Sequence, residues 1–266
     1  MKKLSDSNLA TPVYLKLSQD MPWPEDDFFY LLSRDGFFLC RNHAFFQSST
    51  PTEYGPSELA GHKRFIKLSY PKLPQRLMEK VVGFFSRVAD RYCAEAAVLL
   101  AWNSETESIE VIVPEQRSIV GGSWSGGKFY PINVYYDVPN LPPNLKLIGD
   151  IHSHVDGPAY ASHTDIEDEA HFPGLHIVVG RIYKEPPEIH IEVTVDGNRF
   201  TVENHDMVLE GYKKRRVKEV PEEWMDKVVV ETKTWKSTGA DAQNYYSSSG
   251  YYGDQSEVEE FPRYSN

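Results

Sequence analysis

The feature that most constrains this chain is a short apolar segment that ends in two histidines. Residues 145–151 follow a Pro-Pro pair and have the apolar run that is typical of a buried strand, and His152-Ser153-His154 comes directly after them. Residues i and i+2 of an extended chain point to the same face, so His152 and His154 project together. Any fold of this chain has to carry that pair of imidazoles at one strand end.

A turn and the start of a helix follow the histidines. Asp156-Gly157-Pro158 is typical of a turn, and the residues from Ser162 onward predict a helix with Ser162 as its N-cap and Asp165 in its first turn. A lone His-x-His is common, and Ser-x-x-Asp alone is an ordinary capping box. At this combined spacing, His152, His154 and Asp165 indicate three ligands of one tetrahedral Zn²⁺ per chain. A fourth, open position is the pattern of a catalytic zinc site, and the stretch points to a metal-dependent hydrolase.

Glu95 is the candidate proton acceptor for such a site. It stands where an amphipathic helix, expected over about residues 74–92, gives way to an apolar strand. A carboxylate that enters an apolar strand is costly unless it has a partner or a role. A metal-bound water needs a nearby carboxylate to take and redeliver its proton. The alternative is an exposed glutamate at a helix end.

Together these residues resemble the JAMM, or MPN-plus, family of zinc metalloproteases. The pattern of that family is a Glu on an early strand, followed by His-x-His-x7-Ser-x-x-Asp. All five positions are present in order and at that spacing: Glu95, His152, His154, Ser162 and Asp165. The resemblance covers roughly residues 75–200. It is greatest to the prokaryotic branch, which includes zinc peptidases found beside ubiquitin-like conjugation genes.

Two positions depart from the pattern of many family members. Val155 follows His154 where a proline is common, and Ala97-Val98 replaces a frequent Cys-Gly pair. Neither change removes a catalytic group, but both leave the subfamily open.

The resemblance implies a fold and a role for each residue. The implied fold is α/β: a mixed, curved β-sheet flanked by helices, with the layers of MPN/JAB and cytidine-deaminase-like domains. His152, His154 and Asp165 would hold Zn²⁺, Glu95 would act as general base and then general acid, and Ser162 would donate a hydrogen bond to the oxyanion. The implied reaction is cleavage after the C-terminal glycine of a ubiquitin-like protein, by deconjugation or precursor processing. The implied partners are that protein or its conjugates, and proteins of the conjugation pathway.

Other functions share some of these residues. A zinc hydrolase of another amide or of a sulfur-carrier adduct would have the same site and differ only in substrate. A non-catalytic MPN scaffold usually lacks some ligands, whereas every ligand position is filled here. A DNA-repair relative fits poorly, because the chain is acidic and lacks an Asn-His-Pro-Ser-Gly run.

Several residues near the motif are secondary candidates. Asp150 shares a strand face with His152 and would orient that imidazole, although ordinary solvation at a strand end is the favoured interpretation. Trp124, in a glycine-rich loop, is a candidate substrate contact, because insertions at this place in the resembled family contact the ubiquitin tail. Three nearby histidines are weaker candidates for the site: His163, His171 and His176.

The chain divides into three predicted parts. Residues 1–72 form a β-rich N-terminal extension, residues 73–230 the catalytic domain, and residues 236–266 a disordered tail rich in Tyr, Ser and Gly. The extension is either a substrate-docking module or a cover for an edge of the catalytic sheet.

Local patterns predict smaller features of these parts. Ser33-Arg34-Asp35-Gly36 predicts a hairpin turn, and Phe65–Leu68 predicts a short strand. The basic run at residues 213–216 predicts a solvated helix face, with docking of an acidic partner as the alternative.

Composition excludes several classes of protein. The formal net charge of −11 argues against general nucleic-acid binding, which needs a basic face. The sequence has no apolar run long enough for a membrane helix and no apolar segment near its start that would predict a secretory signal. Its two cysteines, Cys40 and Cys93, are too few for a disulfide framework. We therefore expect a cytoplasmic protein without a membrane partner.

Overall fold

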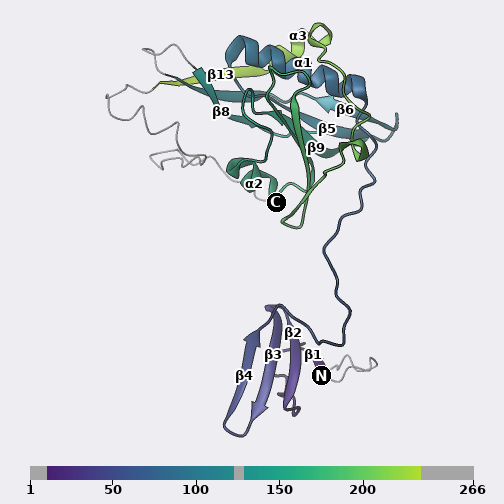
Figure 1. Cartoon of the computed structure of the whole chain (residues 1–266), viewed down its shortest axis with the longest axis vertical. Helices are drawn as coiled ribbons and strands as arrows, with labels where there is room; N and C mark the ends of the chain where they lie inside the picture. Colours follow the sequence, from purple (N-terminus) through teal and green to yellow (C-terminus); the bar gives the residue numbers. More distant parts are fainter. Residues whose placement is uncertain (1–10, 123–128, 235–266) are drawn as a thin grey trace. The chain divides into compact units, whose positions relative to one another are not determined.

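The chain forms two compact units, Met1–Phe65 and Ile66–Asn266, in a computed structural model that describes residues 11–122 and 129–234 (Figure 1). The division falls before the predicted boundary at residue 72. The predicted tail at residues 236–266 lies outside the described residues.

The N-terminal unit is a small antiparallel sheet with one parallel strand added. Its strands, in the described part of the unit, have the order β1-β2-β3-β4: β1 Val13–Leu15, β2 Phe28–Ser33, β3 Gly36–His43 and β4 Phe46–Pro51. β1 is parallel to β2, and the other two pairs are antiparallel. The predicted hairpin turn is confirmed, because Ser33 pairs with Gly36 across a two-residue loop. Phe29, Leu31 and Cys40 form a small core of this unit.

The prediction of a short strand at Phe65–Leu68 is wrong. Residues 61–72 contain no strand, and Phe65 is exposed. Ile66 and Leu68 instead pack, half-buried, against the core of the larger unit. Their apolar pattern therefore reflects burial of side chains without pairing of the backbone.

The larger unit is a mixed α/β domain, as predicted. Its described residues form a six-stranded sheet in the order β12-β11-β10-β9-β5-β6 and a three-stranded sheet in the order β13-β7-β8. The β9–β10 and β13–β7 pairs are parallel and the others antiparallel. The strands are β5 Ala97–Asn103, β6 Ser108–Ile112, β7 Gln116–Gly122, β8 Phe129–Tyr136, β9 Leu145–Ser153, β10 Gly174–Gly180, β11 Glu188–Val195, β12 Asn198–Thr201 and β13 Val228–Thr234.

Three α-helices and two short 3₁₀ segments complete the described part of this unit. They are α1 Gln75–Tyr92, α2 His163–Glu169, α3 Glu222–Asp226, η1 His205–Met207 and η2 Val217–Glu219. The helix expected at about 74–92 is confirmed by α1. No helix among the described residues is long and apolar enough to cross a membrane.

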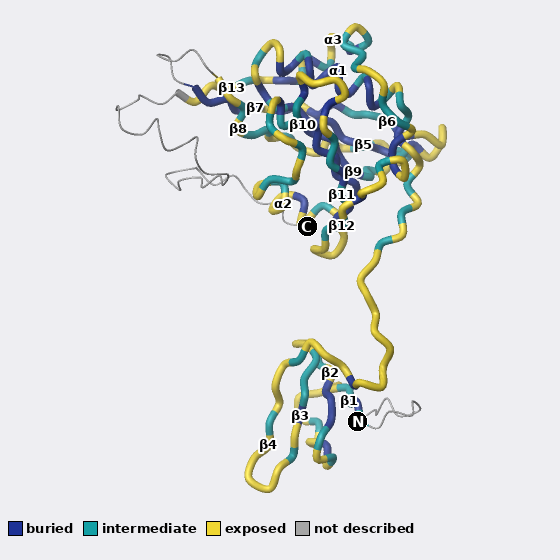
Figure 2. The backbone as a smooth tube through the Cα atoms, viewed as in Figure 1, coloured by how far each residue is buried: buried dark blue, intermediate teal, exposed yellow. Residues whose placement is uncertain are grey.

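The hydrophobic core lies between α1 and one face of the larger sheet. Apolar residues of α1, among them Phe84 and Phe85, are fully buried there together with alternate residues of the central strands, such as Val98, Ile151 and Ile177. Figure 2 shows this burial concentrated in α1 and the central strands. Helix α2 lies on the other side of the strands from α1 (Figure 1). The sheet thus has one apolar face, under α1, and a second face that is available for polar side chains.

The basic run at residues 213–216 is not the helix face that its composition predicts. This segment is irregular, and its last arginine folds back onto α1, where Arg216 Nε lies 2.6 Å from Oε2 of the fully buried Glu79. The backbone N–H of Lys213 also donates to Glu79, at 2.8 Å. Burial alone would raise the pKa of Glu79, but these hydrogen bonds, led by that from Arg216, lower the pKa to about 2.

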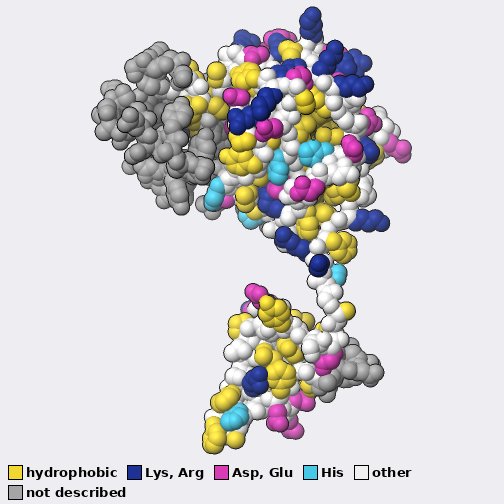
Figure 3. All heavy atoms as spheres, in the orientation of Figure 1, with side chains coloured by type: hydrophobic (Ala, Val, Ile, Leu, Met, Phe, Trp, Pro, Cys, Tyr) yellow, Lys and Arg dark blue, Asp and Glu magenta, His cyan; other side chains and the backbone are white. Residues whose placement is uncertain are grey.

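Lysine and arginine side chains gather at the end of the larger unit where α1 and α3 lie (Figure 3). They are interleaved with acidic side chains: Arg76 pairs with Glu219 at 3.0 Å, and Arg87 with Glu222 at 2.6 Å. Arginines of this surface are therefore paired with acidic side chains within the domain.

Replacing Glu79 with alanine should destabilise the larger unit. Removing the carboxylate deprives Arg216 of its buried partner, although Glu219 still pairs with it, and leaves the N–H of Lys213 without its acceptor, so we expect the free energy of unfolding at pH 7 to fall by about 3 kcal/mol. Because the pKa of Glu79 is depressed, its contribution is complete above its unfolded value and is lost as the pH falls through about 2. Urea unfolding at several pH values measures both effects, with Glu105→Ala, in an exposed turn, as the control. An equal loss in both variants would contradict the role of the pair.

Candidate metal centre

His152 reaches the site because it is the penultimate residue of β9. It pairs with Ala97 of β5 on one side and with Val178 of β10 on the other, so both neighbours of the strand fix its position. Ile151, one residue earlier, belongs to the core under α1, and alternation along the strand turns His152 to the opposite face. Its side chain is only 8% exposed.

His154 is oriented by the turn that follows β9. The N–H of Gly157 donates to the carbonyl of His154 at 2.8 Å and closes the turn, as the sequence predicts. His154 Nδ1 lies 3.2 Å from the carbonyl oxygen of Pro158. A carbonyl can only accept, so Nδ1 carries a hydrogen, and Nε2 is the nitrogen that faces Asp165 and would bind a metal. Gly180 permits this turn, since a Cβ there would lie 2.3 Å from the backbone nitrogen of Ala159.

Asp165 and Ser162 are delivered by the first turn of α2. The predicted N-cap is confirmed: Ser162 Oγ accepts a hydrogen bond from the N–H of Asp165 at 3.2 Å, and the N–H of Ser162 donates to Asp165 Oδ2 at 2.6 Å. This reciprocal capping box satisfies two backbone donors and turns the Asp165 carboxylate back toward the strand end. The Ser162 hydroxyl keeps its own hydrogen for donation.

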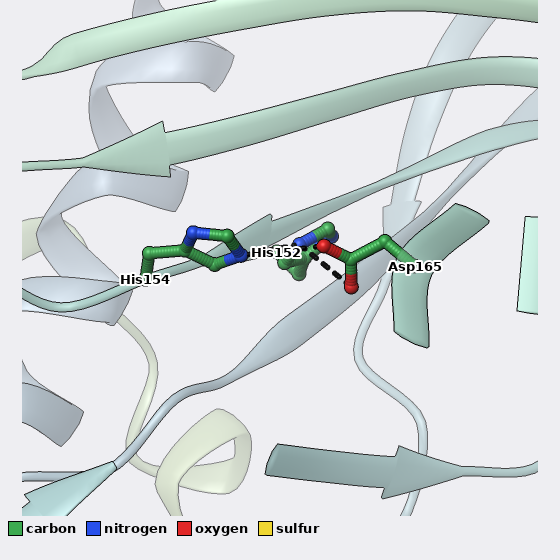
Figure 4. Close-up of side chains that lie close together, drawn as sticks. All are labelled: His152, His154 and Asp165. Atoms are coloured by element: carbon green, nitrogen blue, oxygen red, sulfur yellow. Dashed lines mark hydrogen bonds and ion pairs between the residues drawn. The ribbon is translucent and has the colours of Figure 1, made fainter. Parts of the chain in front are cut away.

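The three predicted ligands converge (Figure 4). The Nε2 atoms of His152 and His154 are 3.3 Å apart, and each lies 3.4 Å from a carboxylate oxygen of Asp165, Oδ1 and Oδ2 respectively. Two ligand atoms bound to zinc at tetrahedral angles lie about 3.3–3.4 Å apart, given Zn–N distances of about 2.0–2.1 Å. These separations, in which each Nε2 faces a different carboxylate oxygen, are therefore close to those between the ligands of one tetrahedral zinc ion, and the three side chains are called here the triangle.

The electrostatics of the triangle match a cation site. Burial alone would lower the pKa of His152, but the hydrogen bond and the charge of Asp165 outweigh it and raise the pKa to about 9. Burial likewise opposes ionisation of Asp165, yet hydrogen bonds from His152 and His154 hold its pKa well below the usual range. A zinc ion would replace the proton between these groups, because a histidine ligand binds metal in its neutral form.

Glu95 lies beside the triangle, two residues before β5, the strand that pairs with β9. Ser153 N–H donates to the carbonyl of Ala96 at 3.0 Å, which continues the β5–β9 register and places Glu95 opposite His154. Ser118 Oγ holds the Glu95 carbonyl at 2.7 Å. Burial raises the pKa of the Glu95 carboxyl to about 7, and the neighbouring imidazoles offset only part of that rise.

The secondary candidates separate into exposed and buried groups. His163 and His171 are exposed. Asp150 is buried, and its carboxylate accepts from the Tyr136 hydroxyl at 2.8 Å and faces His176 Nδ1 at 3.1 Å, so the interpretation of Asp150 as a solvated strand end is wrong. Trp124 lies outside the described residues.

Sequence reasoning missed the polar side chains that surround Asp150. Tyr136, Glu169 and Arg199 come from three different elements and meet only in the folded domain. The one available signal was Glu169, a charged residue four positions after Asp165 that lies on the same face of a short helix.

Residues 83–194 match the family described as prokaryotic homologs of the JAB domain, which supports the predicted family for this part of the chain. All five motif positions fall inside the match. No curated protein matches the chain. Among solved structures, a JAB1/MPN domain protein from Archaeoglobus fulgidus is similar, with 18% sequence identity and a TM-score of 0.28. The similarity covers 48% of this chain and 92% of that chain.

The first test of the centre is its metal content. We expect about one zinc per chain in the wild type and almost none in His152→Ala/His154→Ala prepared in parallel, because the double variant keeps only one of the three ligands. Elemental analysis of both proteins after dialysis measures the difference. His163→Ala, which removes an exposed histidine of α2, is the control and should retain the metal. Equal and negligible zinc in all three proteins would contradict the assignment.

Proposed function

We propose that this chain is a zinc-dependent peptidase or isopeptidase that cleaves after the C-terminal glycine of a ubiquitin-like protein. The observation that carries the proposal is the convergence of His152, His154 and Asp165 near zinc spacing, with Glu95 just before the adjoining strand β5. A non-catalytic scaffold would need none of the four, so their joint presence favours an enzyme.

Each residue has a distinct part in the reaction. Zinc, when bound by the triangle, polarises the scissile carbonyl and lowers the pKa of a water to about 7. The Glu95 carboxylate takes a proton from the attacking water and redelivers it to the leaving amine. The Ser162 hydroxyl, whose oxygen is already engaged by the helix cap, donates its hydrogen to the developing oxyanion.

The strand beside the site favours an extended peptide as substrate. β8 is an edge strand of the three-stranded sheet in the described part of the chain, and its last residue, Tyr136, contacts Asp150 next to the ligands. Phe129, Tyr130 and Tyr135 of this strand are exposed. An edge strand can pair with an extended chain, and a terminal Gly-Gly can pass where side chains cannot. An adduct of a small molecule or a sulfur carrier is the second candidate substrate, since it would use the same centre.

A fusion of a ubiquitin-like protein to a short C-terminal extension tests the substrate. We expect cleavage directly after the terminal glycine, and its loss when that glycine is replaced by valine. Mass spectrometry of the products identifies the bond. If zinc-loaded protein cleaves small acyl-amides but no fusion, the result would favour an adduct of a small molecule or a sulfur carrier as the substrate. If zinc-loaded protein cleaves neither, the result would support a non-catalytic scaffold.

Glu95→Gln should keep the zinc and lose turnover. The amide cannot accept the proton of the attacking water, so we expect kcat to fall by about 10²–10⁴. Cleavage assays paired with metal analysis separate this result from loss of the ion. A variant that contains zinc and turns over at the wild-type rate would remove Glu95 from the mechanism.

Ser162→Ala should lower kcat by about 10²–10³ if the hydroxyl stabilises the oxyanion. The substitution also removes the cap of α2, so Ser162→Thr, which retains both the hydroxyl and the capping oxygen, is the matched control. Steady-state kinetics and zinc content are measured on both variants. A change confined to KM, or equal losses in the two variants, would argue against the assignment.

A further inference from the structure

A buried group of charged side chains lies next to the metal centre, on the same face of the sheet. It comes from five different elements and is called here the buried charge cluster: the buried Asp150 of β9, Glu169 of α2 and His176 of β10, and the partly exposed Glu192 of β11 and Arg199 of β12. The side chains of Asp150, Glu169 and His176 are 4%, 6% and 1% exposed. Charges at this depth need partners, because desolvation of an unpaired ion is costly.

Glu169 is the member that joins α2 to the cluster. Its Oε2 lies 2.7 Å from Arg199 Nη1, and its Oε1 lies 3.6 Å from His176 Nδ1. Arg199 is itself fixed by Glu192, to which its Nε donates at 2.6 Å. The glutamate is therefore held from one side by β10 and from the other by β12.

His176 is a cation in this arrangement. Its Nδ1 faces the Asp150 carboxylate at 3.1 Å, and its Nε2 faces the carbonyl oxygen of Phe172 at 3.0 Å. Neither a carbonyl nor an ionised carboxylate can donate a hydrogen bond, so both ring nitrogens carry hydrogens when Asp150 is ionised. Two cations, His176 and Arg199, thus face the Glu169 carboxylate.

Helix α2 has little else to hold it in place. Of its seven residues, all described, only Glu169 is buried, and its one large apolar side chain, Ile166, is 45% exposed. An isolated helix of this length is not stable in water. Yet this helix carries Asp165 and begins at Ser162, the two residues that the site requires from it.

We propose that Glu169 is a positioning residue, which Arg199 and His176 hold so that α2 presents Asp165 to His152 and His154 at metal-binding distance. The inference rests on the proposed function only in assuming that the triangle binds zinc. The first turn of α2 is then fixed by Asp165 at the metal, and the last turn by Glu169 in the cluster. Loss of the Glu169 contacts would let Asp165 move away from the metal-binding position.

A second metal site is the competing interpretation of the same residues. Asp150, His152 and Glu169 each offer a ligand atom, and these atoms lie within 4.8 Å of one another. Both carboxylates are already engaged by positive groups, however, and a metal bound there would lie close to the Arg199 guanidinium. The contacts therefore favour an anchor, and the metal stoichiometry distinguishes the two.

The test is the affinity of the full chain for zinc, measured by competition with a chromophoric chelator. Relative to the wild type, we expect Kd to rise about 10–100-fold in Glu169→Gln and in Arg199→Met, the range seen when partners of metal ligands are removed. Arg199→Lys, which keeps a positive charge, should recover part of the affinity. The visible spectrum of the Co²⁺ form should lose tetrahedral intensity in the first two variants, a readout that needs no catalysis.

The matched control is Arg216→Met, which breaks the buried pair with Glu79 on α1. It should lower the thermal stability of the metal-free protein as Arg199→Met does, but leave the zinc Kd and the Co²⁺ spectrum unchanged. Equal shifts in both arginine variants would overturn the positioning role and show a general loss of stability.

The remaining outcomes separate this inference from the proposed function. Wild-type zinc affinity in Glu169→Gln would overturn the anchor while the metal centre stands, and absence of zinc from the wild type would overturn both. Two zinc ions per wild-type chain, with one lost in Glu169→Gln, would replace the anchor by the second metal site. If Glu169→Gln fails to fold, Arg199→Lys and Arg199→Met decide the question by the same measurements.

Discussion

The alternation of side chains along β9 is the constraint on which the rest of the larger unit depends. Ile151 points into the core under α1, while Asp150 and His152, its two neighbours, point to the opposite face. Val98 of β5 and Ile177 of β10 pair with Ile151 from either side, and both also point into the core. A slip of one residue in the pairing would exchange a core residue for a metal ligand. The burial of the apolar face therefore also specifies the site.

The two helices on either side of this sheet are held by different forces. α1 is an 18-residue helix with a continuous apolar face, and burial of that face accounts for its position. α2 lacks such a face and depends on polar contacts: the hydrogen bonds of the Asp165 cap and the ion pair of Glu169 with Arg199. Hydrophobic burial is non-directional, whereas a charge-assisted hydrogen bond has a fixed geometry. The second kind of contact suits a helix whose carboxylate must meet two imidazoles within tenths of an ångström.

The sequence predicts the parts of this structure whose cause is local. The strand before His152, the cap at Ser162 and the hairpin turn at residues 33–36 each depend on a few consecutive residues, and each is present. The misjudged features depend on distant partners. The sequence around Asp150 indicates an exposed strand end, because the neighbouring His176 comes from a different strand, β10. The basic run at 213–216 likewise indicates solvated side chains, because Glu79, the partner of Arg216, lies far away in the sequence on α1. Charge alone does not reveal whether a side chain is exposed or paired inside the domain.

Asp165 links the folding of α2 to the formation of the metal centre. Its Oδ2 accepts the hydrogen bond that caps the helix, and the same carboxylate faces both histidines. Buried ion pairs such as Glu169–Arg199 add little net stability, because desolvation offsets most of their attraction, but they restrict where the paired elements can sit. The cluster therefore contributes position rather than stability to α2. An ion bound at the triangle stabilises α2 in the position where it supplies Asp165. A contact that already holds α2 in that position raises the affinity for the ion, and the ion stabilises that contact by the same coupling free energy.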